Sequence, residues 1–175
     1  MSSFRDKPHV APFVGPPWYV AAVWLLVAVV AQATVVHFLA IRGVVPSLVL
    51  VVVVWYAIRV DVRRAVLYGL AAGLCEDVLA AQSGAAWTIS TIATAALASV
   101  LSRGFFADSI PLAAAVAVIA TLVRALLFWT IMSVEGYPSG LGAMHLREAL
   151  FSAVLNVSVM IAAIIVARRF DTSAA

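Results

Sequence analysis

Two adjacent carboxylic acids, Glu76 and Asp77, stand in an otherwise apolar stretch of the chain, and an arginine, Arg124, stands in another. Paired carboxylates can act as general acid and base or carry a proton, and charged groups within apolar stretches are energetically costly. The sequence places no nucleophile, cofactor-binding loop or His/Cys metal cluster beside them, and it has no HExxH, GxSxG or phosphate-binding loop motif. We therefore expect no catalytic residue, no metal site and no cofactor.

The three charged residues lie at similar depth if their stretches are membrane-spanning helices. Arg124 is near the middle of 110–134, and Asp77 is about as far from Arg64, at the start of its own stretch. Because an arginine in hydrocarbon needs a partner, we expect Asp77 to pair with Arg124 and fix the helix register, with Glu76 as a second acceptor. The alternative is that both carboxylates lie near the membrane interface and contact water.

The composition excludes most soluble classes of protein. Of 175 residues, 65% are hydrophobic and 11% are charged, whereas a soluble domain has roughly 45–50% apolar and about 25% charged residues. The mean hydropathy is +1.12. A net charge of +3 spread over scattered basic residues does not indicate nucleic-acid binding. The single cysteine, Cys75, cannot form an internal disulfide. The sequence therefore predicts an integral membrane protein.

Six apolar stretches are long enough, or nearly so, to cross a bilayer as helices. They are 18–40, 44–58, 65–80, 85–101, 110–134 and 149–167. We expect one transmembrane domain over 18–169, with a flexible cytoplasmic N-terminal tail over 1–17 and a short cytoplasmic tail over 170–175. Residues 31–33 imitate a signal-peptide cleavage site, but the apolar run continues beyond them, so we expect an uncleaved anchor.

The distribution of basic residues predicts the orientation, because cytoplasmic loops are enriched in Lys and Arg. With both termini in the cytoplasm, the outer loops hold only Arg42 and Arg147. The cytoplasmic segments then hold Arg5, Lys7, Arg59, Arg63, Arg64, Arg103, Arg168 and Arg169.

Other polar and small residues in the spans predict contacts between helices. Gln32 and Asn156 are expected to form hydrogen bonds between helices, and His37 is expected to be a packing residue. Gly69 and Gly73 lie on one helical face, where small residues allow close approach of another helix. That helix could belong to this chain or to a partner protein.

Three stretches resemble MreD, the family of bacterial rod shape-determining membrane proteins. The first stretch holds a glutamine in span one, then a glycine and Pro46; a proline suits the first turn of the aliphatic second span. The second stretch holds a basic residue, a GxxxG pair and an aspartate. The third stretch holds an asparagine in the last span. These residues are Gln32, Gly43, Pro46, Arg64, Gly69, Gly73, Asp77 and Asn156. The chain departs from the family at Ser47, where many members have an acid, and at Glu76, an extra acid.

The resemblance implies an all-α, six-helix transmembrane bundle, similar to the S components of energy-coupling-factor transporters. It also implies a multi-pass protein of the bacterial inner membrane that is a non-enzymatic scaffold of cell elongation and side-wall peptidoglycan synthesis. The implied partners are the bitopic protein MreC and, through it, MreB, RodA and a class B penicillin-binding transpeptidase, together with membrane lipid and without nucleic acid.

Two other functions stay open. A substrate-binding S component of a vitamin transporter would need a pocket that opens outward, lined by Gln32, His37, Asp77, Arg124 and Asn156, with 135–148 as a candidate capping loop. An intramembrane enzyme acting on a lipid-linked substrate would need a catalytic constellation that the sequence lacks.

Overall fold

The computed structural model describes residues 15–81, 85–103, 109–136 and 138–172. Within these ranges the chain is helical, with no strand beyond an isolated bridge between Ile41 and Val44. The elements are α1 (Trp18–Thr34), the 3-10 helix η1 (Val36–Leu39), α2 (Leu48–Ala57), α3 (Val62–Ala80), α4 (Ala86–Leu101), α5 (Ile110–Val134), the 3-10 helix η2 (Ser139–Leu141) and α6 (Gly142–Thr172). Most of the predicted N-terminal tail lies outside the described residues.

Six helices correspond to the six predicted spans, which confirms a helical membrane bundle. Two of them, α5 and the Gly142–Val166 part of α6, are long and apolar enough to cross a bilayer, while α1, α2 and α4 are shorter apolar helices. The predicted stretch 110–134 coincides with α5, but α6 begins well before residue 149. Polar residues such as Arg147 lower the hydropathy there without preventing the helix.

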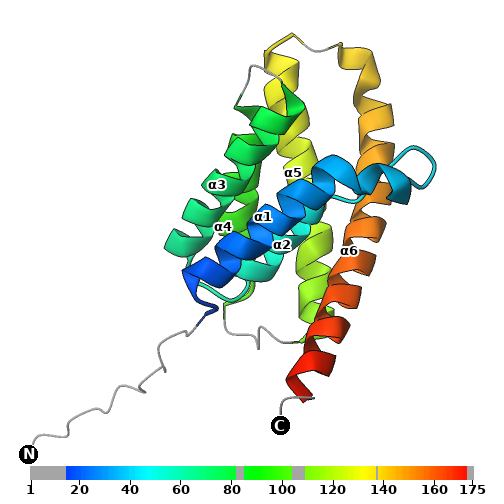
Figure 1. Cartoon of the computed structure of the whole chain (residues 1–175). Coiled ribbons are helices and arrows are strands. Elements are labelled where there is room, and N and C mark those ends of the chain that lie inside the picture. The colour runs from blue at the N-terminus through cyan, green and yellow to red at the C-terminus, as the bar shows by residue number, and fades with distance from the viewer. Residues whose placement is uncertain (1–14, 82–84, 104–108, 137, 173–175) are drawn as a thin grey trace, which may run out of the picture.

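The first two helices depart most from simple spans. In Figure 1, α1 crosses the front of the bundle obliquely, and the chain then turns back beside α6, below the level at which α3 ends and α6 begins. From this turn α2 runs to the lower end of the bundle over only 10 residues. The second predicted span is therefore a half-length helix that begins inside the bundle.

Helix α2 is the centre of the fold. It contacts α1, α3, α4, α5 and α6, and seven of its residues are buried, namely Val49, Leu50, Val51, Val53, Val54, Tyr56 and Ala57. A helix that is apolar on all sides is typical of a protein core or of a membrane span. The helices around α2 also bring polar side chains to its start.

The close contact between α3 and α4 depends on the two glycines predicted to allow close approach of a helix. A Cβ atom on Gly69 would lie 2.8 Å from Cβ of Ala95, and one on Gly73 would lie 2.5 Å from Cα of Thr88. Since these separations are too short for a methyl group, only glycine permits this approach. Gly69 and Gly73 are therefore used for packing within the chain, the first of the two alternatives that the sequence allowed.

Candidate functional site

The start of α2 is held by side chains from other helices. Ser47 is the N-cap, and its Oγ accepts a hydrogen bond from the Leu50 backbone N–H at 3.2 Å. The Ser47 N–H donates to Asn156 Oδ1 and the Leu48 N–H donates to Gln32 Oε1, each at 2.7 Å. The first N–H groups of a helix lack partners within that helix, and an unpaired one is costly away from water. Gln32 and Asn156 therefore provide the acceptors that water would provide at a surface.

Pro46 lies directly before this N-cap and contacts the same glutamine. It is buried, and its carbonyl accepts a hydrogen bond from Gln32 Nε2 at 3.3 Å. The expectation that Pro46 occupies the first turn of the helix is wrong by position. Because Ser47 caps α2, the proline lies just before the cap, where it directs the chain into the helix.

Asn156 connects α6 to this cap. It is 1% exposed, and its Nδ2 donates to Thr121 Oγ1 on α5 at 3.1 Å and to Ser152 Oγ at 3.4 Å. Its side-chain oxygen and nitrogen thus both have partners, as a buried amide requires. The structure thus places Asn156 in hydrogen bonds that join α6 to α5 and to the start of α2.

Arg124 is the buried cation of the site. Its Nη2 donates to Glu76 Oε1 at 2.6 Å, its Nη1 donates to Ser47 Oγ at 3.0 Å, and its guanidinium carbon lies 4.6 Å from the centroid of the Trp87 ring. The Arg124 and Glu76 side chains are 5% and 11% exposed. The Arg124 Nε atom is buried and has no hydrogen-bond partner among the described residues. The guanidinium therefore joins α3, α5 and the start of α2.

Of the two acceptors predicted for Arg124, Glu76 makes the contact, and the prediction of Asp77 as the main partner is wrong. Both Asp77 oxygens instead accept from the start of α4: Oδ1 from the Trp87 N–H at 3.2 Å, and Oδ2 from the Thr88 N–H at 3.0 Å and the Thr88 hydroxyl at 2.5 Å. A carboxylate at a helix N-terminus accepts hydrogen bonds from the free N–H groups there. Its negative charge also interacts favourably with the helix dipole. Consecutive helical residues point about 100° apart, so Asp77 faces α4 while Glu76 faces α5.

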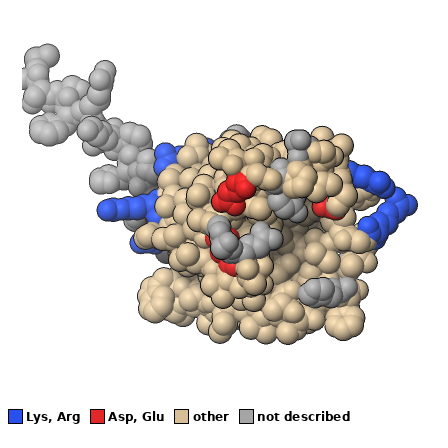
Figure 2. All heavy atoms as spheres, turned by 90° about the horizontal axis from the view of Figure 1, so that it is seen from above, with Lys and Arg blue, Asp and Glu red and all other residues tan. Residues whose placement is uncertain are grey.

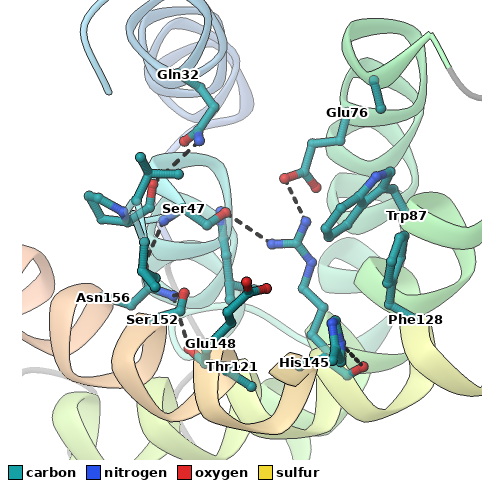
Figure 3. A pocket seen from close by; sticks show the side chains of 18 of the residues that line it. Gln32, Ser47, Glu76, Trp87, Thr121, Phe128, His145, Glu148, Ser152 and Asn156 are labelled. Atoms are coloured by element: carbon teal, nitrogen blue, oxygen red, sulfur yellow. Dashed lines mark hydrogen bonds and ion pairs between the residues drawn. The ribbon is translucent and has the colours of Figure 1, made fainter. Parts of the chain in front are cut away.

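Above these contacts lies an open cavity of about 600 Å³. Figure 3 shows Gln32, Ser47, Asn156 and Ser152 on one side of it, and Glu76, Trp87 and Phe128 on the other. Trp87 and Phe128 stack at 4.1 Å between ring centroids. His145, whose Nε2 lies 3.0 Å from the Ala125 carbonyl oxygen, and the exposed Glu148 also line the cavity. The cavity thus combines polar groups with an aromatic wall, and Arg124 forms part of its lining.

The cavity shares part of the lining that the alternative function of a transporter component would need. Gln32, Arg124 and Asn156 line it, and the residue that joins them in place of Asp77 is Glu76. The side chain of His37 lies outside the described part of the chain. Sequence reasoning missed the role of Ser47, although a serine directly before an aliphatic run is a common N-cap signal. It also missed Trp87 and Thr121, for which the sequence offers no signal.

Comparison of the chain with models of protein families gives a match to the family described as rod shape-determining protein MreD, over residues 15–166. The corresponding comparisons with curated proteins and with solved structures give no match.

Proposed function

The chain belongs to the MreD family of rod shape-determining proteins, and from this we propose that it is a non-enzymatic scaffold of bacterial cell elongation. In this role it binds the transmembrane helix of an MreC-like protein and, through it, MreB, RodA and a class B penicillin-binding transpeptidase. The observation that carries the proposal is the family match, which covers almost all of the membrane bundle. The proposed location is the bacterial inner membrane, as a multi-pass protein.

The proposed orientation has both termini in the cytoplasm. In Figure 1 the start of α1 and the end of α6 lie at the same, lower end of the bundle. Arg59, Arg63 and Arg64 follow α2 or begin α3 at this end, and Arg103 follows α4. Such a concentration of arginine favours the cytoplasmic side. The cavity then opens to the outer side of the membrane.

The surface proposed to receive the partner helix is the α1–α3 groove, a hollow of about 600 Å³ between these two helices. Gly69 and Gly73 are used internally, so the docking surface must lie elsewhere. The α1–α3 groove is lined by Ala22 and Ala71, which are small and exposed, and by Leu67, which is 62% exposed. Helices associate in membranes through close packing at small residues. A single apolar helix fits these requirements.

The test is affinity purification of the tagged chain from native membranes, with mass spectrometry of the bound proteins. The variant Ala22→Leu/Ala71→Leu fills the α1–α3 groove, and Ala115→Leu is its control, because Ala115 is an exposed alanine on α5. We expect the unmodified chain and the control to retain an MreC-like protein, and the groove variant to lose it. Retention by all three chains would refute the groove as docking surface, and recovery of no MreC-like protein by any chain would refute the scaffold function.

A second candidate, the substrate-binding component of a micronutrient transporter, is favoured by one observation, the cavity. A planar apolar part of a small ligand could stack on Trp87 and Phe128, and its polar groups could contact polar lining residues such as Ser152. In the same purification this function requires a cytoplasmic ATPase pair and a second membrane subunit to be retained. Their recovery in place of an MreC-like protein would establish solute uptake.

A further inference from the structure

Two arginines on the upper part of the molecule approach one aromatic ring. The guanidinium carbons of Arg42 and Arg147 lie 6.0 Å and 5.9 Å from the centroid of the Phe151 ring. Arg42 lies in the turn between α1 and α2, whereas Arg147 and Phe151 lie one helical turn apart on α6. Both arginines are exposed, and among the side chains that the structure describes neither has a carboxylate partner. Two positive charges are thus held at one place without a counterion among the described residues.

The position of Arg42 is fixed by its backbone. The Ile41 N–H donates to the Val44 carbonyl at 2.9 Å and the Val44 N–H donates to the Ile41 carbonyl at 3.0 Å, which closes a two-residue turn. Arg42 and Gly43 occupy this turn with φ angles of +55° and +82°. Glycine or asparagine adopts such angles readily, whereas an arginine there is unfavourable. The turn therefore presents an arginine at a position that favours another residue type.

Exposed apolar side chains lie next to Arg42 in the chain and near Arg147 along α6. Ile41 is 56% exposed, Leu150 is 53% exposed and Val154 is 65% exposed. Figure 2, which looks down on the upper end, shows basic side chains at the edges of this face and acidic ones nearer its middle. A ligand for this edge must carry negative charge next to a long apolar part.

We propose that Arg42, Arg147 and Phe151 form a binding site for the phosphate of an anionic phospholipid. The planar guanidinium groups match phosphate oxygens in geometry and charge, and a cation–π contact with the Phe151 ring limits their freedom before binding. The acyl chains then lie along the exposed apolar side chains of α6. Basic sites of this kind at the edges of membrane helices recognise anionic headgroups. The site is separate from the α1–α3 groove and does not depend on the proposed scaffold function.

The test is native mass spectrometry of the full chain in mild detergent with an equimolar mixture of dioleoyl phosphatidylglycerol and dioleoyl phosphatidylcholine. We expect the unmodified chain to retain phosphatidylglycerol preferentially. The variant Arg42→Asn/Arg147→Gln removes both charges, and asparagine tolerates the backbone of the turn. Since each basic side chain at an anionic surface strengthens binding about fivefold, this variant should lower the preference by about 25-fold.

The control variant is Arg63→Gln/Arg103→Gln, which removes the same charge from exposed arginines near the lower end of the bundle. It should retain most of the preference. The variant Phe151→Leu keeps both charges and should lose part of the preference, because the guanidinium groups lose their common ring. An equal loss in the control variant, or no preference in the unmodified chain, would overturn the site. Release of the lipid by millimolar inorganic phosphate would overturn a lipid ligand in favour of a free phosphate ion.

Discussion

Removing the carboxylate of Glu76 should destabilise the protein strongly, because it leaves Arg124 buried and charged without a partner. The two groups are joined at 2.6 Å, with the arginine side chain 5% exposed and the glutamate side chain 11% exposed. Breaking a buried ion pair from one side costs about 3–5 kcal/mol. Since Glu76 also lines the open cavity, where water can reach it, we expect the lower part of this range, about 3 kcal/mol, for Glu76→Gln.

The pair can be identified by a double-mutant cycle with Arg124→Met. This change alone leaves the glutamate, which still accepts a hydrogen bond from Thr91 and lines the open cavity, so its cost should be lower, about 2 kcal/mol. The double variant contains neither charge and should be less destabilised than the sum of the single variants, by about 2 kcal/mol. The measurement is the free energy of unfolding in mixed micelles of a mild detergent and dodecyl sulfate, followed by circular dichroism.

The same cycle with Asp77→Asn provides the control. Asp77 caps α4 through the N–H groups of Trp87 and Thr88, so losing its charge should cost about 1 kcal/mol by weakening that cap. Its coupling to Arg124→Met should not exceed about 0.5 kcal/mol. Additive effects for Glu76 and Arg124, or a coupling to Asp77 larger than that to Glu76, would refute the assignment of the partners.

The remaining predictions concern packing and buried hydrogen bonds, each measured as the free energy of unfolding in the same micelles. Gly73→Ala should destabilise the protein by about 1–3 kcal/mol, because the added methyl group meets backbone atoms of α4. Gly140→Ala is the control and should have little effect, because a Cβ atom there meets nothing within 4 Å. Equal effects of the two changes would contradict the close contact between α3 and α4. Asn156→Leu should cost about 1–3 kcal/mol by leaving the Ser47 N–H without its acceptor, and the exposed Ser158→Ala on the same helix should cost far less. Tyr68→Phe removes a 2.7 Å hydrogen bond to the backbone of α1 and should cost about 1 kcal/mol; an unchanged stability would show that this bond contributes nothing.

The sequence predicts the number and rough position of the helices because apolar length is a direct requirement of the bilayer. It does not predict that α2 begins inside the bundle, since the apolar run 44–58 is continuous across the turn and the helix start. Hydropathy indicates which residues can lie in the membrane, but it does not indicate where a helix begins. The start of α2 is determined by the cap at Ser47 and by its partners on α1 and α6.

The candidate site shows the same limit. Counting residues along each span placed the acidic pair of α3 level with Arg124, and this level is correct, since Glu76 contacts the guanidinium. The choice between two adjacent carboxylates depends on the rotation of α3 about its own axis. That rotation follows from the contact of Gly69 and Gly73 with α4, which only the assembled bundle defines.

The hydrogen bond between Ser47 and Asn156 joins residues 109 positions apart in the chain. During synthesis α2 emerges early, while the amide that receives its first N–H group is made near the end. Until α6 arrives, the start of α2 needs water or the insertion machinery to satisfy that N–H. In the folded protein this N–H group is therefore satisfied only once the last helix has docked. A chain shortened before Asn156 would lack this acceptor, and the N–H group at the start of α2 would have no partner from α6.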